Sequence, residues 1–386
     1  MPKVDVVIAG GGAVGSATAY FLTEQPGFTG SILVIEPDPT YQFAASTRSA
    51  ASIRRQFSTP LNIELSTFGI EFLRTCRNGL ADVNLKESTY LTLATPDGAA
   101  ALRGNVEAQR RCGVPVRLHD AGGLAEAYPW INVADLAAGA DTSGGEGWFD
   151  GHGLLHGLRR AAINRGVRYL RDRVDCVLMD GARTVTGVRL SGGDSLHCRW
   201  LVNAAGTHSR TLAASAGVDL PVFARKRNVF VFQSAHAPVD CPLIVDPSSL
   251  WCRPEGTRFI CGVVPENDAD VALNDFEVDY EEFDAVVWPA LAHRVPAFEA
   301  IRVQSAWAGH YDFNVFDQNA FLGPCDTVPN LILASGFSGH GLQHAPAMGR
   351  ALAEIIRFGE YRSIDVTPFS YARYLRNEPL RELGVI

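Results

Sequence analysis

The most restrictive feature of the chain is a glycine-rich turn between a buried strand and a helix, close to the first residue. Val4 to Ala9 is a short run rich in β-branched residues, typical of a strand buried in a parallel sheet. Gly10, Gly12 and Gly15 follow with G-x-G-x-x-G spacing and lead into a helical segment. In this pattern the first glycine permits a tight turn, the second lets a pyrophosphate approach the backbone, and the third lets helix and strand pack closely.

An acidic residue follows at the spacing that this pattern requires. A second strand, Ser31 to Ile35, ends at Glu36, 21 positions after Gly15. A carboxylate at this place accepts hydrogen bonds from ribose hydroxyls. The first helical residues, Ala13 and Val14, offer phosphates unpaired N–H groups and the positive end of the helix dipole. The pattern therefore predicts dinucleotide binding, and both NAD and FAD fit it.

Length and composition predict a two-domain protein with a large core. The chain has 386 residues and no internal repeat, so two interleaved domains are expected. Hydrophobic residues make up 47% and charged residues 20%. With 34 basic and 42 acidic residues the net charge is −8, and the longest basic run is Arg225-Lys226-Arg227. We therefore expect no nucleic-acid partner, which would require a basic surface.

The cysteines and the apolar runs predict where the protein resides. Eight cysteines are scattered without a CxxC pair or a Cys/His cluster, so we expect no metal site. We interpret them as reduced and mostly buried, as in a cytoplasmic protein. No apolar run approaches the ~18 residues of a membrane span, so no transmembrane segment is expected.

Two further strand-to-glycine transitions occur later in the chain. The strand ending at Leu201 and Val202 leads into "NAAGTHS" at 203–209, and the strand Leu331 to Leu333 leads into "GFSGHGLQ" at 336–343. A helix should follow the last loop, with Pro346 in its first turn and Gly359 at its end. Reduction of a flavin places negative charge on its ring, which a second helix N-terminus stabilises, whereas a nicotinamide loses positive charge. The second loop therefore favours FAD over NAD.

A small, hydroxyl-rich and basic segment lies between these loops, at residues 44–60. Ser46, Thr47 and Arg48 have the side chains needed to bind phosphates and ribityl hydroxyls of an extended cofactor. A surface Ser/Thr turn is the alternative interpretation.

These motifs, taken in order, resemble those of the D-amino-acid oxidase superfamily. The resemblance rests on Gly10 to Gly15, Glu36, Ser46 to Arg48, Asn203 to Gly206 and "GFSGHG", and it covers nearly the whole chain. Its nearest branch contains sarcosine oxidase, glycine oxidase and D-amino-acid dehydrogenases. The segments "GFSGHG" and "WAGHYDFNVFDQNAFLG" also resemble a flavoprotein that assists assembly of a respiratory-chain complex, which supplies a non-metabolic alternative.

The resemblance implies an α/β fold with a Rossmann-like, GR2-type FAD-binding domain and a second, α+β substrate domain on an antiparallel sheet. The implied FAD domain is discontinuous, with residues 1–80, 150–222 and 325–386. Residues 81–149 and 223–324 would form the substrate domain. The implied FAD contacts are Gly10, Gly12, Ala13, Val14, Glu36, Ser46, Thr47, Arg48, Val174, Ala205, Gly206, Gly339, His340, Gly341, Leu342 and Gln343, with His340 acting through its backbone.

Three departures from the family pattern change the expected flavin attachment, reaction with oxygen and substrate binding. No cysteine stands in 307–316, where sarcosine oxidase attaches its flavin, so the FAD is expected to be non-covalent. Ile260 stands where sarcosine oxidase has a lysine for oxygen activation, which favours a dehydrogenase. Gln343 replaces a lysine that helps to bind the substrate carboxylate.

The implied reaction is oxidation of the C–N bond of an amino acid or N-alkyl amino acid by hydride transfer to flavin N5, giving an imine. Arg54 aligns best with the arginine that binds the substrate carboxylate in the family, and Arg55 is the alternative. If neither has this role, the two are a pair of exposed arginines after a turn. His310 and Tyr311 are candidates to shape the pocket or accept a proton, or to be structural. Oxygen or another carrier would accept the electrons. An NAD-dependent dehydrogenase and a flavin-binding assembly protein without turnover are the competing functions.

Overall fold

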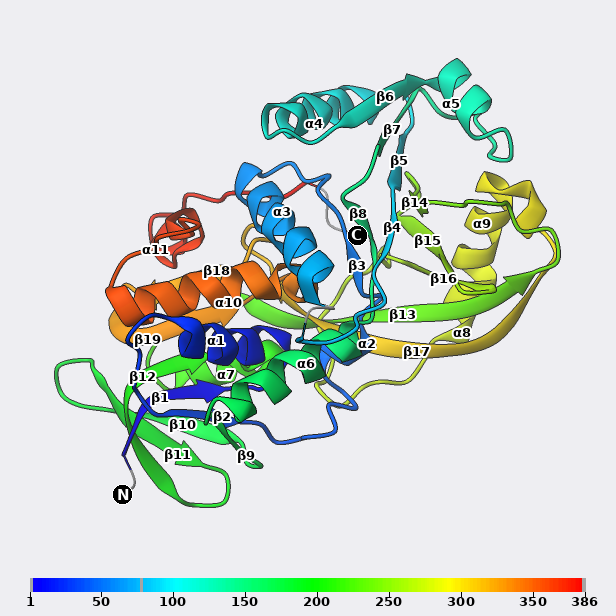
Figure 1. Ribbon diagram of the computed structural model, residues 1–386. Helices are drawn as coiled ribbons and strands as arrows, with labels where there is room; N and C mark the ends of the chain where they lie inside the picture. Colours follow the sequence, from blue (N-terminus) through cyan, green and yellow to red (C-terminus); the bar gives the residue numbers. More distant parts are fainter. Residues whose placement is uncertain (1–2, 77–78, 384–386) are drawn as a thin grey trace.

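Two large sheets organise the chain, and a third small sheet lies between them (Figure 1). The structure is a computed structural model that describes residues 3–76 and 79–383. The first sheet contains β1 Lys3–Ala9, β2 Ile32–Ile35, β9 Arg168–Leu170, β10 Val174–Met179, β11 Val185–Leu190, β12 Ser195–Asn203, β18 Phe321–Cys325 and β19 Val328–Ser335.

The centre of the first sheet is parallel, as the strand patterns predicted. β1 pairs in parallel with β2 and β12, β2 with β9, and β12 with β19. The carboxyl ends of these strands therefore meet at one edge, where ligands bind in open α/β sheets. Ala9, Ile35, Asn203 and Ser335 end four of them, so both glycine loops begin at this edge.

Helices cover both faces of this sheet. They include α1 Ala13–Glu24, α3 Pro60–Thr75, α6 Gly151–Asn164, α7 Ser209–Ala214 and α10 Gly341–Phe358. Separate buried clusters on the two faces explain why the strands are almost wholly apolar. α1 and α10 pack so closely that a Cβ on Gly349 would lie only 2.6 Å from the backbone of Ala17. This close packing lets both helices begin beside the same strand ends.

The second sheet has the order β17-β13-β16-β15-β14-β5-β7-β6. It is antiparallel, as predicted, except for the parallel pair of β14 and β5. Its strands are β5 Tyr90–Ala94, β6 Val116–Asp120, β7 Ala138–Thr142, β13 Val222–Ser234, β14 Leu243–Val245, β15 Leu250–Glu255, β16 Arg258–Val263 and β17 Ile301–Asn314. The helices beside it are α4 Ala99–Arg111, α5 Ala121–Ala127, α8 Tyr280–Glu282 and α9 Trp288–Arg294.

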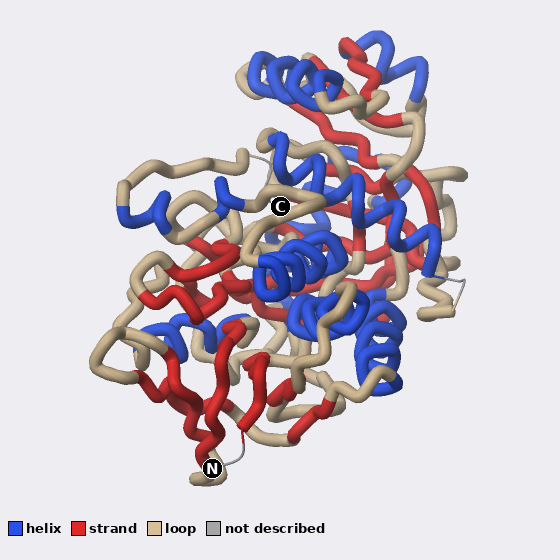
Figure 2. Tube along the Cα trace, turned by 60° about the vertical axis from the view of Figure 1, so that its left-hand side comes forward, coloured by secondary structure: helices blue, strands red, loops and turns tan. Residues whose placement is uncertain are grey.

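Short elements join the two large sheets. The small sheet contains β3 Ser52–Ile53, β4 Lys86–Ser88 and β8 Glu146–Trp148, in the order β3-β8-β4. α2 Ala45–Arg48 lies close to β17, and α11 Ala372–Leu375 lies near the end of the chain. In Figure 2 the first sheet lies at the bottom, around the N-terminus, and helices separate it from the strands in the upper half.

The fold class is confirmed, and one detail of the helix prediction is wrong. α10 begins at Gly341, so Pro346 lies in its second turn rather than its first. The N–H of His344 already bonds to the carbonyl of His340, which fixes the earlier start. Gly359 ends the helix with φ +76°, as predicted. Within residues 3–76 and 79–383, no helix is both long and apolar enough to cross a membrane. The division into a cofactor domain and a substrate domain stays a prediction.

Candidate active site

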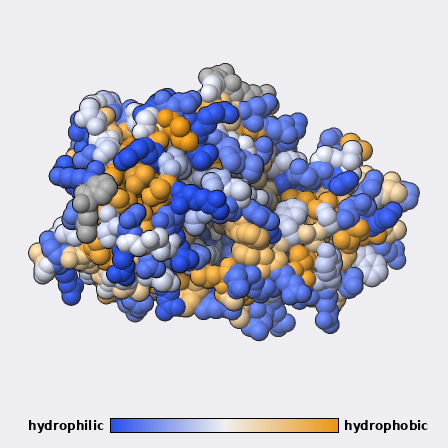
Figure 3. Space-filling view, turned by 90° about the horizontal axis from the view of Figure 1, so that it is seen from below, coloured by the Kyte–Doolittle hydropathy of each residue, from blue (hydrophilic) through white to orange (hydrophobic). Residues whose placement is uncertain are grey.

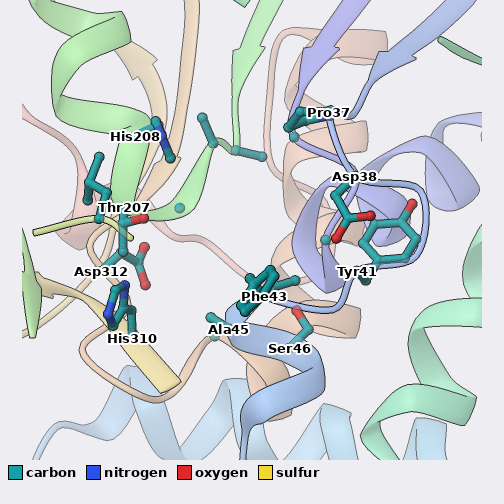
Figure 4. Close-up of a pocket in the computed structure, with 18 of the residues that line it drawn as sticks. Pro37, Asp38, Tyr41, Phe43, Ala45, Ser46, Thr207, His208, His310 and Asp312 are labelled. Carbon is teal, nitrogen blue, oxygen red and sulfur yellow. The ribbon is translucent and has the colours of Figure 1, made fainter. Parts of the chain in front are cut away.

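One cavity of about 960 Å³ opens at the carboxyl edge of the first sheet. Both glycine loops line it, together with the end of β17 and residues after β2 and β12. Figure 4 shows Asp38 and Tyr41 on one side, His310 and Asp312 on the other, and Phe43, Ala45 and Ser46 between them. Of the predicted residues, the cavity is lined by Gly10, Gly12, Ala13, Val14, Glu36, Ser46, Val174, Ala205, Gly206, Gly339, Gly341, Leu342, His310 and Tyr311.

The three glycines of the first loop differ in what surrounds them. Gly10 has φ +99°, and a Cβ there would lie 2.2 Å from the carbonyl oxygen of Ala204. A Cβ on Gly15 would lie 2.0 Å from the carbonyl oxygen of Gly10. Gly12 is different, because its only neighbour within 4 Å would be the Ser46 hydroxyl at 3.5 Å. Gly10 and Gly15 are thus required by the fold, whereas Gly12 leaves an open surface on the cavity.

Glu36 holds the first loop through its carboxylate. Its Oε2 accepts a hydrogen bond from the Gly11 N–H at 2.8 Å, and its Oε1 accepts one from the Asp38 N–H at 2.9 Å. Burial raises the pKa of Glu36, while these two hydrogen bonds oppose the rise. The carboxylate lies at the cavity wall, where its remaining lone pairs can meet ribose hydroxyls.

The predicted phosphate-binding segment contributes fewer side chains than expected. The Ser46 hydroxyl lines the cavity and accepts a hydrogen bond from the Ala13 N–H at 3.0 Å. The Thr47 hydroxyl instead faces the carbonyls of Tyr41 and Ala44, so its donor is used within its own turn. Neither Thr47 nor Arg48 lines the cavity, and their contacts with the cofactor stay predictions.

Arg48 closes the outside of the site rather than facing the cavity. Its guanidinium donates to the carbonyls of Gln42 and Ala308, at 2.9 and 2.7 Å. It also lies over the rings of Phe43 and Phe276, at 4.8 and 5.0 Å from their centroids. These contacts join the segment before α2 to the second sheet.

The second loop is held by a carboxylate that the sequence did not single out. Asp312 Oδ2 accepts hydrogen bonds from the N–H groups of Gly336 and Phe337, at 2.8 and 3.3 Å. Burial raises the pKa of Asp312 to about 6. Gly339 has φ +90°, and a Cβ there would lie 2.5 Å from the Tyr311 ring. The sequence signal that could have identified Asp312 is its position two residues after His310, because side chains alternate along a strand and these two therefore lie on the same face of β17.

Arg54, His340 and Gln343 form a group behind the second loop, outside the cavity wall. Arg54 is only 5% exposed, which contradicts the interpretation of an exposed arginine pair. Its guanidinium donates to the Gln56 carbonyl and contacts His340 Nε2 at 3.2 Å. Since a guanidinium can only donate, this His340 nitrogen is the acceptor. Gln343 Oε1 accepts a hydrogen bond from the Arg54 backbone N–H at 2.9 Å.

Arg55 points away from this group, and His310 and Tyr311 face the cavity. The Arg55 guanidinium donates to the Gly144 carbonyl at 2.7 Å, and Arg55 does not line the cavity. His310 Nε2 lies 2.6 Å from the Asp275 carbonyl, so this nitrogen carries the proton. Burial lowers the pKa of His310 and raises that of Tyr311, and both side chains are therefore neutral at pH 7.

Comparison with known proteins decides the family. The sequence model of DAO, described as FAD dependent oxidoreductase, matches residues 5–355. The chain is a member of this family. FAD-dependent oxidoreductase domain-containing protein 1 from Xenopus laevis is 38% identical over 425 residues, covering 100% of this chain and 85% of the relative. Human mitochondrial sarcosine dehydrogenase is 25% identical, over 92% of this chain and 40% of the relative.

A solved structure supports the same fold. L-proline dehydrogenase from P. horikoshii superimposes with a TM-score of 0.86 at 23% identity, covering 98% of this chain and 100% of that one. DAO-family proteins depend on FAD, so the resemblance drawn from the sequence is confirmed, and so is the choice of FAD over NAD.

The cavity residues fit FAD. The volume of about 960 Å³ lies within the range of cofactor sites. Gly12 offers the bare backbone that a pyrophosphate needs, at a helix start whose first N–H groups have no intrahelical partner. Glu36 stands beside this loop, and the start of α10 opens on the same cavity. Tyr41, Arg173 and Thr207 also line it but were not predicted, because no local pattern distinguishes them.

Proposed function

We propose that this FAD-dependent oxidoreductase oxidises the C–N bond of an amino acid or an N-alkyl amino acid. The observation that carries the proposal is the single cavity that joins the Gly12 turn to His310, Tyr311 and the start of α10. A cofactor that fills this cavity would be held at one end by the Gly12 turn and would meet His310 and Tyr311, near the end of β17, at the other. Similarity to sarcosine dehydrogenase, whose name states an N-methyl amino acid substrate, supports the choice of substrate class.

The protein would hold FAD through residues of both loops. The start of α1 and Ser46 would bind the diphosphate, Glu36 the ribose, and the N–H groups at the start of α10 the ring. Bound FAD supplies the acceptor for a hydride from the carbon next to the substrate nitrogen. None of the cysteines lines the cavity in the described residues, which supports non-covalent binding.

The substrate would be oriented by the chain's own polar groups. Arg54 is the candidate for the substrate carboxylate because it aligns with the substrate arginine of the family; its guanidinium lies behind the second loop, against Phe57 and His340, and does not line the cavity. Neutral Tyr311 would donate a hydrogen bond to the substrate, and neutral His310 would line the wall through its acceptor nitrogen.

We also propose that residues 1–80, 150–222 and 325–386 form the FAD domain and that residues 81–149 and 223–324 form the substrate domain. We propose a cytoplasmic location for the protein.

A dehydrogenase is favoured over an oxidase. Ile260 is buried in an apolar cluster with Val229 and Val231, against which Trp251 packs. Ile260 itself supplies no positive charge for the negative charge that forms when oxygen is reduced, and Arg253, its partner on β15, is engaged by the Ala50 carbonyl and the Glu255 carboxylate. We therefore expect slow reaction with oxygen and faster reaction with another acceptor.

Anaerobic reduction of the bound flavin tests the proposed function. The holoprotein is mixed with L-, D- and N-methyl amino acids, and the loss of flavin absorbance is followed. Bleaching by one class identifies the substrate. No bleaching by any amine would reject the proposal and favour a flavoprotein without turnover.

Two adjacent arginines provide a matched pair of variants. Arg54→Ala should lower the ratio of the reduction rate to substrate Kd about 100-fold, because a charge-assisted carboxylate contact is lost. Arg55→Ala removes the same side chain one position away and should change it less than about threefold. FAD content and Tm are measured in both variants. Equal kinetics in Arg54→Ala and the parent would remove Arg54 from the site.

A further inference from the structure

One segment of the second sheet carries a concentrated negative charge. Residues 265–284, here called the acidic segment, contain nine Asp or Glu residues and no Lys or Arg. Their charge alone exceeds the net −8 of the whole chain. The segment leaves β16, continues into α8, and runs below β17 in yellow-green in Figure 1.

The inner side of the acidic segment closes the FAD cavity. Leu273, Phe276 and Glu277 line the cavity wall. The Phe276 ring stacks on His310, with centroids 4.2 Å apart, and meets the Phe43 ring at 4.7 Å. Phe43 is 48% exposed and Leu273 is 38% exposed. Aromatic side chains therefore connect the cavity wall to the molecular surface. Figure 3, which views the molecule from below, shows a hollow bordered by hydrophobic and hydrophilic side chains.

Three carboxylates of the segment are neutralised from the inside. The basic run of β13 supplies the partners: Arg227 pairs with Asp268 at 2.7 Å, Lys226 with Asp275 at 2.7 Å, and Arg225 with Asp270. These ion pairs attach the segment to β13. They also explain why the longest basic run of the sequence leaves no basic surface.

The outer carboxylates remain without cationic partners. Glu266, Glu277, Glu281 and Asp284 are exposed. Within residues 3–76 and 79–383 they form no ion pair with Lys, Arg or His. Like charges held close together without partners destabilise the free protein, and a bound cationic surface relieves the repulsion.

The sign of this charge selects the class of partner. The exposed carboxylates of the acidic segment, here called the acidic rim, share that segment with the exposed Leu273 and are complementary to a protein with a basic rim. Anionic lipid headgroups and nucleic-acid phosphates would be repelled by the same rim. The acidic segment also contributes Phe276 and Glu277 to the cavity wall beside His310.

We propose that a basic electron-accepting protein docks on the acidic segment, around Phe43 and Leu273, and reoxidises the cofactor. This docking rests on the proposed dehydrogenase function. Reduced FAD, as FADH⁻, releases two electrons and one proton; two one-electron carriers take one electron each, and the proton passes to solvent. The absence of a lysine at Ile260 makes oxygen a poor substitute for such a partner.

Zero-length cross-linking maps the surface without any turnover. Cytochrome c is the probe, as a basic protein that accepts single electrons. A carbodiimide couples protein carboxylates to its lysines, and mass spectrometry identifies the joined residues. Cross-links should concentrate on Glu266, Glu281 and Asp284 and disappear at high ionic strength. Cross-links spread over distant glutamates would overturn the proposal.

Reoxidation kinetics test the same surface in the working holoprotein. The flavin is reduced with dithionite, which needs no amine, and is then mixed with ferric cytochrome c. A triple variant, Glu266→Gln, Glu281→Gln and Asp284→Asn, should react about three- to tenfold more slowly at low ionic strength and equally at high ionic strength. The matched control is Glu64→Gln, Glu107→Gln and Glu126→Gln, three exposed glutamates on α3, α4 and α5.

Each outcome of the kinetic test decides one question. The docking surface is rejected if the triple variant is reoxidised as fast as the parent, or if the control variant slows as much as the triple variant. It is also rejected if a quinone in anionic lipid vesicles, offered together with cytochrome c, takes the electrons instead. Because dithionite replaces the substrate, these outcomes do not depend on the amine. Failure of the amine panel alone would reject the proposed reaction while leaving the docking result unchanged.

Discussion

The two glycine loops are built on one plan but by different parts of the molecule. Each follows a strand of the first sheet, precedes a helix and lines the same cavity. Each is also held by a carboxylate that accepts a backbone N–H at 2.8 Å, Glu36 from Gly11 and Asp312 from Gly336. Glu36 directly follows β2, the neighbouring strand of the same sheet, whereas Asp312 comes from β17 of the other sheet. The second loop therefore depends on how the two sheets are assembled.

The atoms that crowd the glycines differ accordingly. In the first loop they belong to the backbone, at 2.2 Å from Gly10 and 2.0 Å from Gly15. At Gly339 and Gly341 of the second loop they belong to aromatic side chains, Tyr311 at 2.5 Å from Gly339 and Phe337 at 3.0 Å from Gly341. A side chain can move or be replaced, but a backbone cannot. Substitutions should therefore destabilise the protein most at Gly10 and Gly15.

Gly15→Ala should have the largest effect. Its Cβ would meet the Gly10 carbonyl oxygen, so α1 could not pack on the turn, and we expect a loss of at least about 4 kcal/mol in the free energy of unfolding. Gly104→Ala is the control, since Gly104 lies within α4 with nothing within 4 Å. That change should stabilise the protein by about 0.5–1 kcal/mol. Urea unfolding measures both, and a stable Gly15→Ala protein would contradict the backbone clash.

Gly12→Ala should separate binding from folding. The protein has room for this Cβ, so the unfolding free energy of the apoprotein should change by less than about 1 kcal/mol. The methyl group would occupy the surface that the diphosphate approaches, so the Kd for FAD should rise about 100-fold. Quenching of flavin fluorescence gives the Kd, and apoprotein unfolding gives the stability. Unchanged FAD affinity would place the diphosphate elsewhere.

The same contrast explains what the sequence could predict. The first loop is encoded within 36 residues, so spacing alone singled out Gly10, Gly12 and Glu36, which line the cavity; their contacts with FAD stay predictions. Asp312 was missed because its partners lie 24 and 25 positions away, in the loop that follows β19 of the other sheet. Arg48 has the chemistry for phosphates, but its guanidinium is engaged by two carbonyls and two rings. Such contacts depend on tertiary packing, which local patterns do not encode.

Gly339→Ala should have an intermediate effect that depends on Tyr311. The new Cβ meets the Tyr311 ring and also strains a backbone at φ +90°, so we expect a loss of about 2–3 kcal/mol in unfolding free energy. In a Tyr311→Ala background only the backbone strain remains, about 1 kcal/mol. The double-mutant cycle measures the difference. Equal losses in both backgrounds would show that the ring does not confine this loop.

Asp312→Asn should have the smallest effect, and its dependence on pH identifies the cause. The amide oxygen can still accept the N–H groups of Gly336 and Phe337, so the loop should stay in place. The pKa of Asp312 is raised by burial from 3.8 to about 6, which means that ionisation is harder in the folded protein than in the unfolded chain.

The sign of the pH effect follows from this raised pKa. Below pH 4 the carboxyl is protonated in both states and adds no difference. Between pH 4 and 6 the carboxyl is ionised in the unfolded chain but still protonated in the folded protein, so the parent loses stability relative to Asp312→Asn as the pH rises. Above pH 6 the difference in unfolding free energy between the two proteins is constant. From pH 5 to pH 7.5 we expect a relative loss of about 1 kcal/mol, measured by urea unfolding of both apoproteins. A gap that stays the same at both pH values would mean that the buried carboxylate is not what makes the second loop sensitive, and that the two loops differ in steric crowding alone.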